Sequence, residues 1–100
     1  MNKNSFYEKC YKVLLKVPKG KVTTYKSIAH SLGSRAYRAV GTAMNKNPYS
    51  PKVTCHRVVN SNGRVGNFAS GTAKKNKMLR VEGIEIKKGK IDLDKFGFRF

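Results

Sequence analysis

Apolar residues recur at helical spacing near the start of the chain. Between Ser5 and Val17 they lie three or four residues apart, at positions 6, 10, 13, 14 and 17. This spacing is typical of one buried face of an α-helix. Asn4 or Ser5 can cap the start of such a helix, and Pro18 predicts its end. We therefore expect a helix from Ser5 to Val17, with Cys10 on its buried side as a structural thiol.

Two shorter helical segments are predicted next. Thr23 and Thr24 can cap a helix over residues 25–32, and Gly33 is a typical residue just beyond a helix end. A second helix is expected from Ser34 to about Met44. Two helices joined by a tight turn indicate a helix-turn-helix.

The second of these helices is rich in small side chains, at Ala36, Ala39, Gly41 and Ala43. Small residues let a helix backbone come close to another surface, which can be DNA or the protein's own core. Arg35 and Arg38 on the same segment favour DNA.

The second half of the chain predicts shorter elements. Residues 53–59 are short and apolar and are expected to form a strand or a buried turn, followed by a hairpin-type turn at 60–63. A helix is predicted from Ala73 to Val81. Apolar residues alternate in 84–86 and 91–93, on either side of Lys-Lys-Gly-Lys, which predicts a terminal hairpin, the wing that often accompanies a helix-turn-helix.

The charge of the chain is strongly one-sided. The 100 residues contain 22 Lys and Arg against 5 Asp and Glu, a net charge of +17, which predicts a polyanionic partner. Nucleic acid is the first candidate, and an anionic membrane surface is the second. No apolar run reaches the roughly 18 residues of a membrane span, so we expect a soluble intracellular protein. A solvated surface is the expected place of the lysines at 74, 75, 77, 87, 88 and 90.

Cysteine and histidine are too few for a metal site or a disulfide framework. The chain has two of each, and none is spaced as zinc ligands are. Cys55 and His56 are nevertheless adjacent. A buried core cysteine beside an unrelated histidine would explain the pair, and so would a nucleophile whose thiolate form is favoured by its neighbours.

Several separated motifs carry a family resemblance. The segments "RAVGTAMNKNP", "TCHRVV", "GNF" and "VEG" occur in this order. Together they resemble the C-terminal domain of O6-alkylguanine-DNA alkyltransferases (methylated-DNA–protein-cysteine methyltransferases), and the resemblance extends from about Phe6 to Ile86. It implies a mostly α fold with small β elements and a winged helix-turn-helix. It also implies stoichiometric, irreversible transfer of an alkyl group from guanine O6 in double-stranded DNA to the protein, with no cofactor and no metal.

The resemblance assigns a role to each residue of the predicted reaction. Cys55 is implied as the alkyl acceptor, and His56 as the base that takes its proton through a water. Glu82 is implied to orient His56, Asn47 to brace the active-site turn, and Tyr25 to donate a hydrogen bond to the guanine. Adjacent side chains generally diverge, which agrees with a relayed proton path.

Further positions are implied to contact DNA. Arg38 resembles the arginine that fills the gap left by a flipped base, since an alkyl group on a stacked base is out of reach. The other implied DNA contacts are Tyr25, Ser34, Arg35, Ala36 and Thr42. The implied alkylguanine pocket consists of Val58, Val65, Gly66, Asn67, Phe68, Ala69 and Ser70.

The sequence departs from the family pattern at three places. Thr54 stands where proline is usual, and Phe68 where tyrosine is frequent. The third is domain content, because we expect residues 1–100 to form a single monomeric domain without the family's usual N-terminal domain. The expected location is the cytoplasm or nucleoid, or the nucleus of a eukaryote.

Two other functions fit the same residues. One is a non-catalytic lesion-binding protein, although such alkyltransferase-like relatives have tryptophan at the position of Cys55. The other is a small basic chromatin-type protein in which Cys55 is inert.

Overall fold

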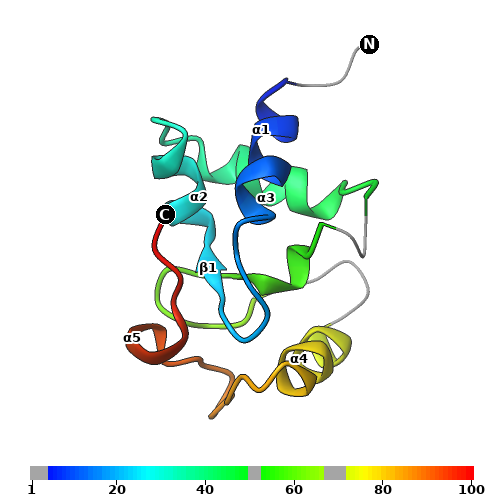
Figure 1. Cartoon of the computed structure of the whole chain (residues 1–100), viewed down its shortest axis with the longest axis vertical. Helices are drawn as coiled ribbons and strands as arrows, with labels where there is room; N and C mark the ends of the chain where they lie inside the picture. The colour runs from blue at the N-terminus through cyan, green and yellow to red at the C-terminus, as the bar shows by residue number, and fades with distance from the viewer. Residues whose placement is uncertain (1–4, 50–52, 67–71) are drawn as a thin grey trace.

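Three helices pack together in the N-terminal part of the protein (Figure 1). The structure is a computed structural model that describes residues 5–49, 53–66 and 72–100. The helices are α1 (Ser5–Leu14), α2 (Tyr25–Ser31) and α3 (Tyr37–Asn45). As predicted, Thr24 caps α2, because its Oγ1 accepts a hydrogen bond of 3.0 Å from the backbone N–H of Ser27.

Helices α1 and α3 each depart from their predicted bounds by three residues at one end. Helix α1 ends at Leu14, and the chain continues in a tight turn in which the N–H of Val17 donates to the carbonyl of Leu14. Helix α3 begins at Tyr37 and not at Ser34, because the Ser34 hydroxyl accepts a hydrogen bond from the N–H of Ala36 and so forms a local turn. Val17 is nevertheless buried, as its place in the apolar pattern predicts.

A very short parallel sheet joins the two halves of the molecule. Strand β1 (Thr23–Thr24) pairs with β2 (Val58–Val59), with Thr23 opposite Val58 and Thr24 opposite Val59. A 3₁₀ helix (Cys55–Arg57) directly precedes β2. The segment 53–59 is therefore both a buried turn and a strand. The pairing places the start of α2 beside the turn that contains Cys55.

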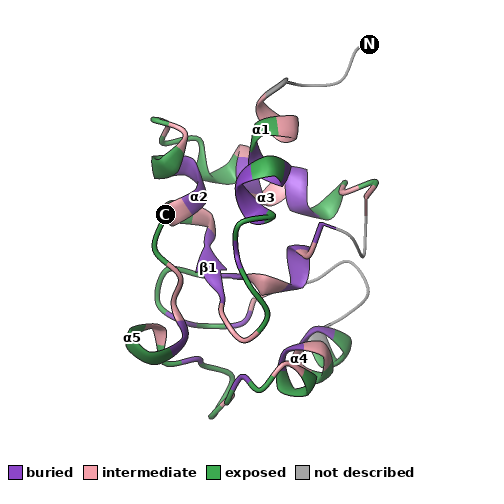
Figure 2. Cartoon of the chain, in the orientation of Figure 1, coloured by how far each residue is buried: buried purple, intermediate pink, exposed green. Residues whose placement is uncertain are grey.

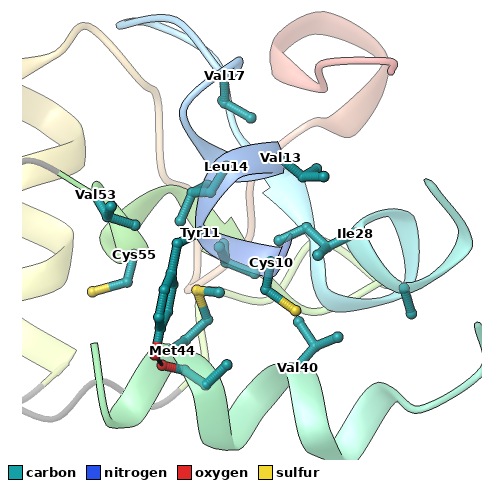
Figure 3. Close-up of a cluster of buried hydrophobic side chains, with 13 residues drawn as sticks. Cys10, Tyr11, Val13, Leu14, Val17, Ile28, Val40, Met44, Val53 and Cys55 are labelled. Carbon is teal, nitrogen blue, oxygen red and sulfur yellow. Dashed lines mark hydrogen bonds between the residues drawn. The ribbon is translucent and has the colours of Figure 1, made fainter. Parts of the chain in front are cut away.

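Buried side chains form two clusters. The first lies among α1, α2, α3 and the 3₁₀ helix (Figure 3). The second lies at the opposite end of the molecule, where the C-terminal elements pack (Figure 2). Val58 of β2 belongs to the first cluster and its neighbour Val59 to the second, because successive side chains of a strand point to opposite faces. The small sheet thus connects the two cores.

The C-terminal part contains α4 (Thr72–Val81) and α5 (Leu93–Phe96). The prediction of a hairpin with two strands over 84–93 is wrong. Within residues 84–93, all of which the structure describes, only Lys87 and Lys90 pair with each other, across a tight turn. The pairing does not extend further because the backbone of 89–91 bonds to residues 63–65 instead. The N–H of Ile91 donates to the carbonyl of Gly63 at 2.8 Å, and Arg64 pairs with Lys90. The wing is thereby reduced to a turn.

The placement of one predicted surface lysine is also wrong. Lys75 is completely buried, while Lys74 and Lys77 beside it are exposed. Lys75 precedes Leu79 by four residues, so both lie on the face of α4 that packs against the protein. The prediction of a mostly helical fold with small β elements and a helix-turn-helix is confirmed. Among the described residues, no helix is long and apolar enough to cross a bilayer.

Candidate active site around Cys55

Cys55 is the first residue of the 3₁₀ helix, at the junction of α3 and the small sheet. It has a free thiol with a residue exposure of 9%, and the adjacent His56 is 5% exposed. The parallel pairing of Val58 with Thr23 fixes this turn next to the start of α2. The thiol therefore lies at the edge of the first core cluster.

His56 and Arg57 both bind Glu82, which follows the end of α4. The Nε2 atom of His56 lies 2.9 Å from Oε2 of Glu82. The guanidinium of Arg57 donates to both carboxylate oxygens, at 2.9 and 2.8 Å, and also to the carbonyl of Val17 at 2.8 Å. A carboxylate that accepts two parallel bonds from one arginine is held in a single orientation. The three side chains thus form a rigid, mostly buried cluster.

The charge of Glu82 is stabilised within this cluster. Burial by itself raises the pKa of a carboxyl group, but the hydrogen bonds and positive charge of Arg57 and His56 lower the pKa of Glu82 below its ordinary value. Glu82 is therefore ionised at neutral pH. Arg57 was not among the residues predicted for the site, although it directly follows His56 in the motif.

Asn47 braces the segment that precedes Cys55. Its Nδ2 donates to the carbonyl of Val53 at 2.8 Å, and its Oδ1 accepts from the N–H of Tyr49 at 2.9 Å. These two bonds join both ends of the loop that leads to the 3₁₀ helix. The role of Asn47 in the reaction stays a prediction.

Tyr25, the first residue of α2, lies close enough to Cys55 for their charges to interact. Burial is the larger cause that raises the pKa of Tyr25, and a negative charge on Cys55 raises it further. The phenol therefore keeps its proton at neutral pH and can serve as a hydrogen-bond donor beside the thiol.

Lys75 is a second group that the sequence analysis did not place in the site. Its Nζ donates to the carbonyl of Val58 at 2.7 Å, three residues after Cys55. Burial lowers the pKa of Lys75 to about 8, and the charge of Cys55 acts in the opposite direction. An ammonium group next to a thiol stabilises the thiolate. The position of Lys75 on the face that contains Leu79 was the signal that could have revealed its burial.

A groove of about 970 Å³ runs along the helix-turn-helix. It brings together predicted DNA-contacting residues, namely Tyr25, Arg35, Ala36 and Arg38. Ser34 and Thr42 instead bond locally: Ser34 accepts from the N–H of Ala36, and Thr42 donates to the carbonyl of Arg38. The predicted turn at Asn60, Ser61 and Asn62 also borders the groove, although these residues were not among the predicted DNA contacts.

The predicted alkylguanine pocket is described only in part. Val58 and Val65 are buried in the first and second core cluster, respectively. Gly66 has a positive φ of 78° and borders a smaller hollow together with Tyr25, Gly41, Asn45 and Asn60. Asn67, Phe68, Ala69 and Ser70 lie outside the described residues. Among the residues that are described, no three His, Cys, Asp or Glu side chains are grouped to hold a metal ion.

The fold and this site define a class of protein: a small basic helix-turn-helix domain with a thiol beside a His–Glu–Arg cluster. The family model described as the DNA-binding domain of 6-O-methylguanine DNA methyltransferase matches residues 5–84. The chain therefore belongs to this family. It is 46% identical over 87 residues to the methylated-DNA–protein-cysteine methyltransferase of Metallosphaera sedula, covering 87% of this chain and 54% of that protein.

Solved structures agree with this assignment. The O6-methylguanine-DNA methyltransferase of Pyrococcus kodakaraensis superposes with a TM-score of 0.74 and 41% identity, over 81% of this chain and 47% of that one. S. pombe Atl1, in a complex with damaged DNA containing O6-carboxymethylguanine, superposes with a TM-score of 0.86 and 32% identity over the full length of both chains. The chain spans about half the length of the curated relatives it matches.

Proposed function

We propose that this protein repairs DNA by transferring the alkyl group of O6-alkylguanine to Cys55. The observation that carries the proposal is the site itself, in which a thiol lies beside a histidine held by Glu82 and near a buried ammonium, that of Lys75. Family membership supports the same reaction.

The reaction is a displacement at a saturated carbon. The thiol proton passes to His56 through a water, and the thiolate attacks the alkyl carbon of the lesion. The new carbon–sulfur bond forms as the bond from that carbon to guanine O6 breaks. The electron pair of the broken bond stays with guanine, which takes up one proton. His56 releases the proton that it took from the thiol, so atoms and charge balance. The S-alkyl cysteine is stable, and each molecule reacts once.

The residues around the thiol have separate tasks in this scheme. Glu82 favours the charged form of His56 after the proton has moved. Lys75 stabilises the thiolate, and Tyr25 donates a hydrogen bond to the guanine as negative charge develops on it. The bonds of Asn47 to Val53 and Tyr49 keep the loop before Cys55 in place.

The partner in this proposal is double-stranded DNA with an O6-alkylguanine. The net charge of +17 and the exposed arginines of the helix-turn-helix support phosphate binding. Arg38 fills the gap that the flipped base leaves in the stack. Arg38→Ala should therefore slow repair of duplex DNA while reaction with the free O6-alkylated base stays nearly normal. Equal losses on both substrates would contradict this role.

A second candidate is lesion binding without transfer. The superposition with S. pombe Atl1 over the full length of both chains favours it. Cys55 is the feature that separates the two candidates, since a binding protein has no need of a reactive thiol.

Intact-mass analysis after incubation with duplex DNA containing O6-methylguanine decides between the candidates. We expect a gain of one methyl group per protein molecule, and peptide mapping should place it on Cys55. Tight binding of the lesion with unchanged protein mass would support the second candidate and contradict the first. Modification of Cys10, or more product than protein, would contradict single transfer to Cys55.

A further inference from the structure

Tyr37 is an exposed aromatic residue inside the basic groove. It is the first residue of α3, with 38% of its surface exposed, and it borders the groove together with Arg35 and Arg38. The other large apolar residues with high exposure in the described part of the chain, Leu15, Val81 and Phe100, are not among the residues that border this groove. Its place in the groove therefore calls for an explanation other than the normal scatter of apolar groups on a surface.

A contact from the preceding helix holds the Tyr37 ring. The Nε2 atom of His30 in α2 lies 2.8 Å from the Tyr37 hydroxyl, and the two rings meet edge to face with their centroids 5.6 Å apart. His30 is itself exposed. The pair therefore adds little buried core, but it limits the rotation of the phenol.

An aromatic ring held in advance is suited to binding. Tyrosine has only two rotatable side-chain bonds, and the contact with His30 reduces the entropy that the ring would lose in a complex. Exposed aromatic rings interleaved with arginines are typical of surfaces that bind nucleic acid, where the rings pack on bases or sugars and the arginines on phosphates. Arg35 and Arg38 on either side of Tyr37 provide that arrangement here.

We propose that Tyr37 is a DNA-contacting residue that packs its ring against a sugar or base of the duplex, and that His30 is its positioning residue. This inference rests on the proposed function, because it assumes that the groove binds DNA. It adds an apolar aromatic contact to the charged contacts that Arg35 and Arg38 offer in the groove. An uncharged contact raises affinity without releasing counterions, whereas each phosphate neutralised adds about 0.9 to the slope of log affinity against log salt.

The test is a salt titration of binding. The affinity for a fluorescein-labelled, undamaged duplex is measured by anisotropy at several salt concentrations for the wild type, Tyr37→Ala, Tyr37→Phe, His30→Phe and Arg35→Ala. Tyr37→Ala should lower affinity roughly 5-fold, the lower end of the range for a lost aromatic contact, because the faces of stacked bases are covered in a duplex. The plot of its log affinity against log salt concentration should run parallel to the plot for the wild type. Arg35→Ala is the charged control and should reduce the slope by about 0.9.

The two conservative variants test the positioning role. Tyr37→Phe keeps the ring and should retain most of the affinity. His30→Phe keeps a ring against Tyr37 but removes the bond to its hydroxyl, so its affinity should lie between those of the wild type and Tyr37→Ala. A His30→Phe protein that binds as the wild type does would overturn the role of His30.

Other outcomes separate this inference from the proposed function. If the wild type does not bind duplex DNA, the proposed function fails. If the wild type binds and Tyr37→Ala binds equally well, or changes the slope as Arg35→Ala does, the uncharged contact is overturned. Thermal denaturation checks that each variant is folded. If Tyr37→Ala is unstable, Tyr37→Leu, which keeps an apolar group but no ring, decides the question by the same criteria.

Discussion

The two cysteines of this protein are buried in the same hydrophobic cluster but in different chemical surroundings. Cys10 is completely buried on α1, and burial raises the pKa of its thiol to about 11. Cys55 is nearly as deep, but Lys75 and Tyr25 lie near enough for their charges to interact with it. In Figure 3 the Cys10 sulfur points towards Val40 of α3, and the Cys55 sulfur points to another side of the cluster. Polar neighbours, and not depth, distinguish the two thiols.

The sharpest test of this difference is to remove each thiol in turn. Cys55→Ala should abolish alkyl transfer from O6-methylguanine in duplex DNA and leave DNA affinity unchanged, because the sulfur is the acceptor and not a DNA contact. Cys10→Ala should transfer normally. Intact-mass spectrometry and anisotropy measure the two properties, and a Cys55→Ala protein that still gains a methyl group would invalidate the comparison.

The second prediction uses the pH dependence of stability that a buried lysine causes. The pKa of Lys75 is about 8 in the folded protein and 10.5 in an unfolded chain. Between these values the unfolded state binds more protons, so the contribution of Lys75 to the free energy of unfolding rises with pH. Lys75→Met lacks this contribution. The stability difference between Lys75→Met and the wild type should therefore change by roughly 3 kcal/mol between pH 8 and 10.5, in favour of the wild type.

Urea denaturation at a series of pH values measures this change. Cys10 also titrates in alkaline solution, but it is present in both proteins and cancels from the difference. Lys74→Met, which alters the exposed neighbouring lysine, should show no such trend. A difference between Lys75→Met and the wild type that stays constant over the whole range would mean that Lys75 is not buried as a charged group.

The third prediction concerns the carboxylate that organises the polar side of Cys55. Glu82→Gln loses the charge that binds His56 and Arg57, and it should lower the free energy of unfolding by about 2 kcal/mol. It should also slow alkyl transfer while DNA affinity is kept. The matched control is Glu85→Gln, because Glu85 forms an ion pair of 2.8 Å with Lys95 at an exposed site, where such pairs contribute little.

Chemical denaturation and a single-turnover rate on O6-methylguanine DNA measure both effects of the Glu82 substitution. We expect Glu85→Gln to match the wild type in both. Equal behaviour of Glu82→Gln and Glu85→Gln would show that the buried cluster has no special role.

The smallest effect predicted is on the reactivity of the thiol towards a simple reagent. Lys75→Met removes the ammonium near Cys55 and should slow its alkylation by iodoacetamide at neutral pH roughly 10-fold. Lys74→Met should leave the rate unchanged. Cys10 should react slowly in all proteins, and peptide mapping separates the two sites. If Cys55 reacts as slowly as Cys10 in the wild type, the difference between the two thiols is only one of position.

Much of the architecture follows from patterns between near neighbours in the sequence. Apolar spacing, the Thr24 cap and the glycine turns predicted α1, α2, α3 and α4, with errors of a few residues at their ends. These features are local, because a cap or a helical face depends on residues within about one turn. The terminal hairpin was the error, because residues 89–91 bond to the distant segment 63–65 and not to residues 84–86.

In the candidate site, too, some features follow from the sequence and others only from the tertiary structure. The motifs indicated Cys55, His56 and Glu82 by their resemblance to a family, and the sequence by itself determined that a thiol and an imidazole are adjacent. Only the tertiary structure decided that Arg57 joins Glu82 to the carbonyl of Val17 and that Lys75 is buried against Val58. These contacts join residues 17 to 40 positions apart. They exist because the burial of two apolar cores brings the ends of distant elements together, and no pattern of near neighbours encodes that.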